Sequence, residues 1–407
     1  MVRPMAVFDL PSSRTDRLTE GAAVRHARRP QYAVADTPDC RLTYWGHRVV
    51  AESPPWEVGL PRCFGWWVAE HGHKGLTKAY VAFEAEPWDA MEAPAPPPGA
   101  TVDANNARSL EELRPWRPVQ DVELRPLTSD ADWAELLAFS IESNDYGDDP
   151  AGQGYLRWQH GVRRQLVRRG GTQLGAYAGG RLVGAAALLS NGQEARYQDV
   201  AVASAFRKRG IATALVGTLA RDARARRPHL PIWITSGVGT QADRIYERLG
   251  FAKRSLGWCW AMDAPLTEEE IRRRWALLKE STLPMEEWRH RDHLWGAVCV
   301  LRDNGGDLSA ALDALRAVLQ RFLLALGVET TDETGYHETL TRGWLTVVGQ
   351  QMAAHPGDTL VEAAIRAQLA FADKRYLLRH WNRDTMMSRA ARYGWVPPDL
   401  APFADAS

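Results

Sequence analysis

What this sequence lacks narrows the classes of protein to which it can belong. Only four of the 407 residues are cysteines, and no two of them form a Cys-x-x-Cys pair. This predicts free thiols in a reducing cytosol rather than a disulfide framework. No apolar run reaches the roughly 18 residues that a membrane span needs, and the first twenty residues hold no apolar core typical of a signal peptide. We therefore expect a cytoplasmic protein without a membrane partner.

The sequence also lacks an excess of either charge. Lys and Arg number 50, as do Asp and Glu, so the formal net charge is zero. A dedicated nucleic-acid binder would carry a basic excess, so we expect no nucleic-acid partner. Hydrophobic residues make up 45% of the chain. A chain of this length with that composition is expected to form more than one packed domain.

The hydrophobic pattern divides the chain into segments with different periods. From Val122 to Met262 it predicts the order β-α-α-β-β-β-α-β-α-β, and beyond Leu266 apolar residues recur at the three- and four-residue spacing of helices. The fold class expected is α+β. The expected segments are a poorly ordered N-terminus (1–35), a small α+β lobe (36–86), a Pro/Ala-rich linker (87–121), an α+β domain (122–265) and an all-helical domain (266–407).

A basic turn stands where the central strand of the α+β domain meets a helix. The turn reads Arg207-Lys208-Arg209-Gly210. A helix start exposes backbone N–H groups without partners, and glycine allows a ligand to approach the backbone closely. Such a turn can hold phosphate oxygens, to which the cations add charge-assisted hydrogen bonds. The alternative is a basic loop that only caps solvent-exposed structure.

Two motifs decide between these alternatives by resemblance. Arg207-x-x-Gly210-x-Ala212 resembles the acyl-CoA-binding motif Q/R-x-x-G-x-G/A of the GNAT-type N-acetyltransferase superfamily, and the stretch 242–251, "ADRIYERLGF", resembles that family's second signature. The resemblance covers roughly residues 122–262. It implies a GNAT-like central mixed sheet with flanking helices, opened between its fourth and fifth strands. It also implies acetyl-CoA as donor and direct attack by the amine of a small molecule.

The resemblance carries site residues with it. The implied cofactor-binding residues are Val200, Ala201, Val202, Arg207, Lys208, Arg209, Gly210, Ile211, Ala212 and Thr213. Tyr246 matches the family's frequent general acid, although a tyrosine there also packs the helix on the sheet. Asp199 and Glu194 are candidate bases, or solvated charges at a strand end. Thr240 and Gln241 stand where many members carry an asparagine, which weakens the expected contacts on that side.

The helical domain carries a second set of candidates. His290 and His293 share one helix face, and His337 and Glu338 open another helix. Histidines and a carboxylate on facing helices can bind a metal ion, so we expect these four residues to line one interior pocket. Their motifs resemble a helical domain of uncharacterised bacterial proteins, H-x-x-H-L and Y-H-E-T. The alternative is a hydrogen-bonded polar core.

Two functions rival an N-acetyltransferase at this stage. The helical domain could carry a second, metal-dependent reaction in a bifunctional enzyme, or the protein could sense acyl-CoA without turnover. A homodimer is also compatible with the sequence. Near the C-terminus, Arg389 and Arg392 could reach an anionic ligand, although a solvated face is the expected role of these two arginines.

Overall fold

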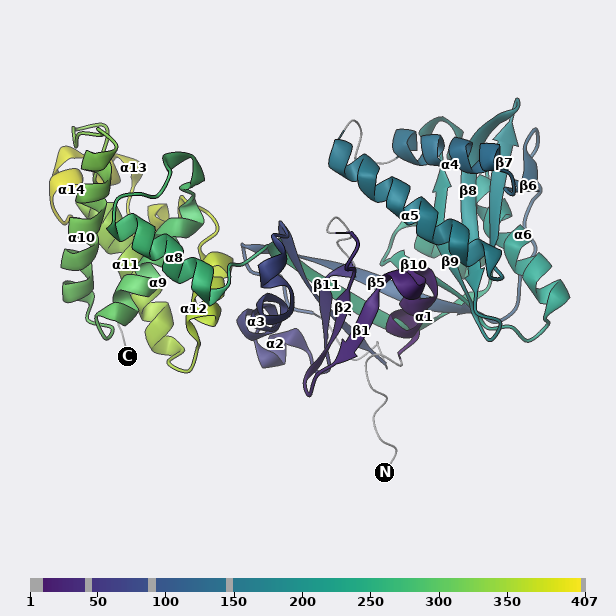
Figure 1. Ribbon diagram of the computed structural model, residues 1–407, viewed down its shortest axis with the longest axis horizontal. Helices are drawn as coiled ribbons and strands as arrows, with labels where there is room; N and C mark the ends of the chain where they lie inside the picture. The colour runs from purple at the N-terminus through teal and green to yellow at the C-terminus, as the bar shows by residue number, and fades with distance from the viewer. Residues whose placement is uncertain (1–9, 41–45, 87–92, 144–148, 404–407) are drawn as a thin grey trace. The chain divides into compact units, whose positions relative to one another are not determined.

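The computed structural model describes residues 10–40, 46–86, 93–143 and 149–403. The chain forms two compact units. The first comprises residues 1–57, 80–94 and 102–260, and the second comprises 58–79, 95–101 and 261–407. The first is built on a mixed sheet and the second is helical, which confirms the α+β fold class and the helical C-terminal region (Figure 1).

Eleven strands form one sheet. In spatial order they are β1 (Arg25–Arg28), β2 (Tyr32–Asp36), β3 (Arg48–Ala51), β4 (Lys78–Ala85), β11 (Phe251–Asp263), β5 (Ala100–Leu110), β10 (Ile232–Gly237), β9 (Ala195–Val202), β8 (Arg181–Ser190), β7 (Thr172–Ala178) and β6 (Glu123–Pro126). β9 runs parallel to β10 and antiparallel to β8, so the sheet changes direction at its centre.

The pairing of β9 with β10 is short. It joins Ala195 to Ile232 and Arg196 to Trp233, yet both strands continue for several residues beyond these pairs. Along that continuation the edge of β9 that faces away from β8 has no ladder partner on β10. A strand edge of this kind leaves backbone N–H and C=O groups open to a ligand. The opening lies between the strands where the sequence resemblance placed one.

Helices cover both faces of this part of the sheet. Alternate side chains of β9 point to opposite faces. The hydroxyl of Tyr197 donates to the carbonyl of Val216 on α6 (Ile211–Arg226) at 2.6 Å, whereas Arg196 donates to Thr15 on α1 (Pro11–Glu20) at 2.8 Å. α1 also packs against α5 (Pro150–Arg168). Therefore α6 lies on one face of β9, and α1 with α5 on the other.

The element order expected from Val122 to Met262 is the order observed. It runs β6, α4 (Asp130–Ser143), α5, β7, β8, β9, α6, β10, α7 (Gln241–Arg248), β11. The glycine pair Gly179-Gly180 turns the β7–β8 hairpin with positive φ at both residues, 56° and 78°, as the two-residue turn requires.

Two segments differ from expectation. Residues 1–35, expected to be poorly ordered, contain α1, β1 and most of β2, although residues 1–9 lie outside the described residues. Residues 87–121, expected to be a linker, contain β5, which pairs antiparallel with β10; residues 87–92 again lie outside the described part. The sequence did not predict these elements because their buried side chains are partly polar. Helix α1 buries Ser13 and Thr15, and strand β5 buries Asn106 and Arg108.

One carboxylate on α7 accepts hydrogen bonds from the two buried polar side chains of β5. Asp243 accepts from Arg108 at 2.8 Å, from Asn106 at 2.9 Å and from Ser236 at 2.7 Å. These contacts tie β5, β10 and α7 together, and the neighbouring guanidinium and amide groups lower the pKa of Asp243 to about 2 despite the opposing effect of burial. A hydrophobic-period search cannot find a strand that is held in this way.

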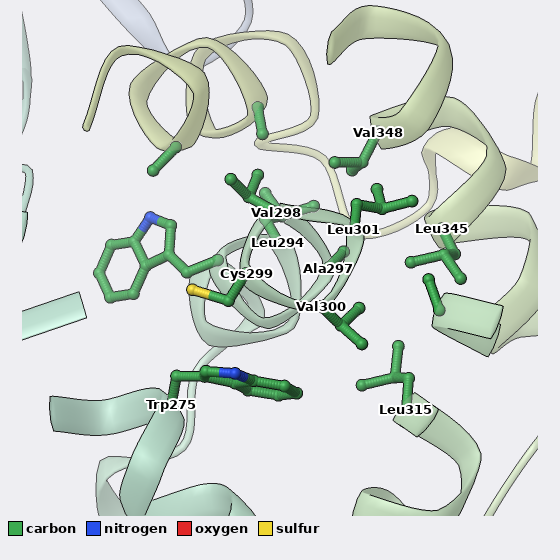
Figure 2. Close-up of a cluster of buried hydrophobic side chains, with 14 of the residues drawn as sticks. Trp275, Leu294, Ala297, Val298, Cys299, Val300, Leu301, Leu315, Leu345 and Val348 are labelled. Carbon is green, nitrogen blue, oxygen red and sulfur yellow. The ribbon is translucent and has the colours of Figure 1, made fainter. Parts of the chain in front are cut away.

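The second unit is a bundle around α9 (His290–Asp303). Its other helices include α3 (Leu60–His71), α8 (Glu268–Lys279), α10 (Leu308–Ala325), α11 (Glu338–Ala354), α12 (Leu360–Ala370), α13 (Arg383–Met386) and α14 (Arg389–Tyr393). Residues 294–301 of α9 are all buried, so this helix is surrounded on every side (Figure 2). Among the described residues, no helix is both long and apolar enough to cross a membrane.

Candidate functional site

A cavity of about 430 Å³ lies where β9, the basic turn, α6 and α7 meet. We call it the cofactor cavity. The predicted cofactor residues that line it are Val200, Ala201, Val202, Arg207, Lys208, Gly210, Ile211, Ala212 and Thr213. Arg209 is the one predicted residue that does not. Tyr246 and Gln241 on α7 complete the wall, so two sequence motifs 30 residues apart meet at one site.

The backbone of the basic turn is shaped to leave donors open. Lys208 and Gly210 have positive φ angles of 65° and 86°. Gly210 is the N-cap of α6, and no side chain caps that helix. The first described backbone bond of the helix joins the Ala214 N–H to the Gly210 carbonyl at 2.9 Å. The N–H groups of the first turn are therefore available to anionic oxygens, which fits a diphosphate.

The three cations of the turn have different roles. Arg207 donates from Nε to the carbonyl of Val202 at 3.2 Å, which holds it against the end of β9. Lys208 lines the cavity. The guanidinium of Arg209 lies 4.9 Å from the ring centroid of Phe206 and stacks on that ring. The sequence-based expectation for Arg209 thus concerns only its backbone, because its side chain is occupied elsewhere.

Tyr246 lines the cofactor cavity. Its side chain is 5% exposed, and no described residue forms a hydrogen bond with the hydroxyl. Burial, with a smaller effect of Asp243, raises the pKa of Tyr246 to about 12. The phenol therefore keeps its proton at neutral pH. The ring also packs edge-to-face on Phe251 at 6.2 Å, so the packing role considered for this tyrosine is present.

Asp199 marks the point where β9 changes its register. Its φ is 48°, and the β8–β9 pairing shifts between Ala185 and Ala187, opposite Asp199. The Asp199 carboxylate pairs with the buried guanidinium of Arg163 on α5 and accepts from Gln198 at 3.2 Å. A bulge of this kind turns side chains out of the alternation of the strand. Asp199 therefore lies at the bulge, directly before the first residue of β9 that lines the cofactor cavity.

Glu194 lies apart from this arrangement. It precedes β9, and its carboxylate pairs with Arg14 of α1 at 3.1 Å. It lines neither of the two cavities on β9. Its observed partner is a structural one. Tyr246 lines the cofactor cavity, whereas Asp199, like Glu194, lines neither cavity and lies one residue before Val200 on β9.

A second cavity, of about 300 Å³, lies on the α1 and α5 face of β9. We call it the charged cavity. Its charged lining residues are Asp16, Glu20, Arg48, Arg163 and Arg196. The sequence analysis named none of these residues, because α1 has no apolar stripe and the three arginines lie on elements that are distant from one another in the sequence. The one available signal was Pro11 followed by a Ser/Thr-rich stretch, a helix start that a search for apolar periods ignores.

Most charges of the charged cavity neutralise one another. Arg48 contacts Glu20 at 2.8 Å and Asp16 at 3.1 Å, and Arg196 contacts Asp16 at 2.5 Å. Burial opposes the charge of Glu20, but Arg48 and His26 outweigh burial and lower the pKa of Glu20 to about 2. The α1 wall of the cavity is therefore a fixed ionic network.

Gln241 and Thr240 take separate roles at the start of α7. Gln241 lines the cofactor cavity, at the position where the sequence departs from the family's usual asparagine. Thr240 is the N-cap of α7 and accepts from the Asp243 N–H at 3.2 Å. A side-chain amide is therefore still present on that wall, one residue from the capping position.

In the helical unit, a cavity of about 470 Å³ is lined by His290, His293 and His337. The Nε2–H of His337 donates to the carbonyl of Met386 at 2.9 Å, and its Nδ1 accepts from the Leu340 N–H at 3.3 Å. His337 is thus the N-cap of α11 with both ring nitrogens engaged. His290 donates to the carbonyl of Phe371 at 2.8 Å.

The remaining candidates of the helical unit are held by structural bonds. Glu338 receives Arg316 in a two-point contact at 2.6 and 2.9 Å and the hydroxyl of Tyr336 at 2.8 Å. His293 accepts from the indole of Trp288 at 2.8 Å, and burial lowers the pKa of His293 to about 4, with a smaller effect of His290. Within the described ranges, the four predicted metal ligands do not form a group of three with ligand atoms within 4.8 Å of one another.

Arg392 and Arg389 also have structural partners. Arg392 is 4% exposed and donates to the backbone carbonyls of four residues, 332, 333, 334 and 336, which fixes the loop before α11. Arg389 is exposed and lies 3.5 Å from Asp332. The solvated face expected for this pair holds for Arg389 and is wrong for Arg392, which is buried.

Comparison with known proteins agrees with the sequence motifs. A model of the acetyltransferase (GNAT) family matches residues 132–251. No curated protein matches the chain. Among solved structures, a GCN5-related N-acetyltransferase from Kribbella flavida is 16% identical with a TM-score of 0.44, covering 62% of this chain and 93% of that one. A functionally unknown conserved protein from Staphylococcus epidermidis is 14% identical with a TM-score of 0.47, covering 58% and 93%.

A third solved structure is a tandem GNAT protein from the clavulanic acid biosynthesis pathway. It is 13% identical with a TM-score of 0.40, covering 61% of this chain and 85% of that one. Similarities at these TM-scores say nothing about the acceptor. The family match spans β7, β8, β9, α6, β10 and α7, the elements that build the opening and the cofactor cavity. The chain therefore contains an acetyltransferase (GNAT) family domain at residues 132–251.

Proposed function

We propose that this protein is an acyl-CoA-dependent N-acyltransferase that transfers an acetyl group from acetyl-CoA to the amine of a small molecule. The observation that carries the proposal is the cofactor cavity. It joins an uncapped helix N-terminus, a basic turn with two positive φ angles and the unpaired edge of β9. A donor with a diphosphate and an amide-bearing arm needs these three features together.

The residues have distinct parts in this reaction. The first turn of α6 and Lys208 bind the diphosphate, and the open edge of β9 at Val200–Val202 offers backbone hydrogen bonds to the arm. When bound, the donor supplies an activated acyl group in its thioester. Tyr246 holds a proton next to the cavity for the departing sulfur, and Asp199 at the bulge is the carboxylate that can accept a proton from the attacking amine.

We extend the proposal to a reducing compartment. All four cysteines are buried free thiols, and burial raises the pKa of Cys63, Cys259 and Cys299 to about 12. Thiols of this kind are unreactive packing residues. A metal-dependent second reaction has no comparable support, because His337 and Glu338 are held by structural hydrogen bonds.

The test is a pair of measurements on Gly210→Val. A valine at a φ of 86° is strained, and its side chain would stand in the phosphate cradle. We expect wild-type protein to bind coenzyme A in calorimetry and to release thiol from acetyl-CoA when an acceptor is present. The variant should bind at least tenfold more weakly. Gly239→Val is the matched control, because Gly239 also has positive φ, 71°, but does not line the cavity. Equal coenzyme A affinity of folded Gly210→Val and wild type refutes the site, and binding without thiol release favours an acyl-CoA sensor.

A further inference from the structure

Among the described residues, Arg163 has the fewest partners of the three guanidinium groups that line the charged cavity. Arg163 is 4% exposed, lines the cavity and has Asp199 as its ion-pair partner; its buried Nε has no partner among the described residues. A guanidinium has five N–H donors and can bind a carboxylate through two of them. Burial lowers the pKa of Arg163 to about 10, because the charged form of a buried side chain is costly. This group can accept a second carboxylate.

The other two arginines of the cavity hold more partners than Arg163, although the Nε of Arg196 is also without a partner among the described residues. Arg48 is shared between Glu20 and Asp16, and Arg196 is bound by Asp16, Thr15 and Thr235. The lining thus carries three guanidinium groups and two carboxylates, and Asp199 brings the balance to zero. A dianionic phosphate would unbalance the site, whereas a zwitterion with one carboxylate and one amine leaves it neutral.

The position of Arg163 fixes where an amine would lie. Arg163 holds Asp199 at the bulge of β9. Gln198 lines the charged cavity and Val200 lines the cofactor cavity, so the two cavities are separated along β9 by two residues, about 7 Å of strand. In an α-amino acid a single carbon separates the amine from the carboxylate. A carboxylate on Arg163 therefore places its amine beside Asp199, one residue along β9 from Val200 of the cofactor cavity.

We propose that the acceptor is a molecule with a free α-amino carboxylate group, and that Arg163 binds its carboxylate in the charged cavity. The inference rests on the proposed function for the fate of the amine, but the binding site stands on Arg163 alone. The side chain of such an acceptor lies against Tyr155 and Trp158, whose rings stack on each other at 6.3 Å and line the cavity.

The experiment measures binding directly, so it does not depend on catalysis. Each of the twenty common L-amino acids is titrated into the full-length protein by calorimetry, with and without coenzyme A. Every amino acid that binds is compared with its carboxamide and its decarboxylated amine. We expect at least one amino acid to bind at least tenfold more tightly than both of these analogues. Absence of binding by every amino acid, or equal binding of acid and carboxamide, overturns the inference.

Substitutions at Arg163 test whether this residue causes the preference for the acid over the carboxamide. Arg163→Gln should abolish the tenfold preference for the acid over the carboxamide, and Arg163→Lys should keep part of it. Arg164→Gln is the matched control, since Arg164 is the next residue of α5, pairs with Asp130 and does not line the cavity. A preference that survives in folded Arg163→Gln overturns the assignment to Arg163. Failure of coenzyme A to bind, with the amino-acid preference intact, refutes the proposed function and leaves the binding site standing.

Discussion

Replacing Tyr246 by phenylalanine removes a hydroxyl at the cofactor cavity that has no hydrogen-bond partner among the described residues. Because no group loses a partner, the free energy of unfolding should change by less than about 0.5 kcal/mol. The pKa of Tyr246, about 12, exceeds the value of about 8.5 for an ordinary thiol. Complete proton transfer from the phenol to a thiolate is therefore uphill, and the hydroxyl acts mainly by donating a hydrogen bond to the developing negative charge.

Because the Tyr246 hydroxyl acts as a hydrogen-bond donor, the energy of one hydrogen bond sets the expected loss of kcat. A hydrogen bond to a charged group contributes about 1.5–3 kcal/mol, so Tyr246→Phe should lower kcat about 10- to 150-fold. A full general acid would give up to about 10⁴-fold. The assay follows thiol release at saturating acetyl-CoA and acceptor, with calorimetry to show that coenzyme A affinity is unchanged.

The control is Tyr197→Phe. This tyrosine is also buried, but its hydroxyl donates to the carbonyl of Val216 and lies outside the cavity. Its loss should reduce stability by about 1 kcal/mol and leave kcat within twofold of wild type. If Tyr246→Phe is folded and its kcat is also within twofold of wild type, the hydroxyl has no part in the reaction and Tyr246 is a packing residue only.

Three further predictions concern stability. The pKa of Glu20 is lowered in the folded state from 4.5 to about 2. The ionised carboxylate therefore contributes about 3 kcal/mol to the free energy of unfolding at neutral pH. This stabilisation is present above pH 4.5 and is lost as the pH falls toward 2. Urea unfolding of wild type and Glu20→Gln should therefore differ at pH 7 and converge near pH 2, and a constant difference contradicts the ion pair. His337→Ala removes the N-cap of α11 and the hydrogen bond to Met386, so it should lower the free energy of unfolding by about 2–3 kcal/mol. The zinc and iron contents measured by mass spectrometry should stay unchanged. Loss of a stoichiometric metal on this substitution contradicts a structural role for His337. Arg392→Met should destabilise the protein by about 3 kcal/mol or more, whereas Arg389→Met, at an exposed arginine on the same helix, should change stability by less than about 0.5 kcal/mol.

Sequence reasoning succeeded where apolar periods and backbone chemistry coincide. The hairpin at Gly179-Gly180, the helix after Gly210 and the order of elements from Val122 to Met262 follow from local signals that the tertiary structure does not override. The cofactor cavity was foreseen because its donors are backbone groups at a turn that the sequence marks with glycine and cations.

Sequence reasoning failed where polar side chains, rather than apolar ones, hold an element in place. Asp243 accepts hydrogen bonds from Asn106 and Arg108 of β5, and Arg196 donates to Thr15 of α1. Because polar side chains hold β5 and α1 in place, these two elements lack the apolar pattern that predicts a strand or a helix. The charged cavity is built from such groups, on segments distant in sequence. The sequence also predicted His337 and Glu338 as metal ligands, because both residue types can bind a metal ion. In the structure His337 caps α11 and Glu338 pairs with Arg316.

The division of the chain between its two units has a consequence for synthesis. The helical unit takes α3 from the first fifth of the sequence, and there α3 buries Cys63, Phe64 and Trp67 and packs against α12. About 290 residues separate the end of α3, at His71, from the start of α12, at Leu360. At roughly 5–20 residues per second, a growing chain carries this apolar helix for about 15 to 60 s before its partner exists. A chain interrupted before α12 therefore lacks the helix against which α3 packs, and its apolar side chains are exposed to the binding of a chaperone.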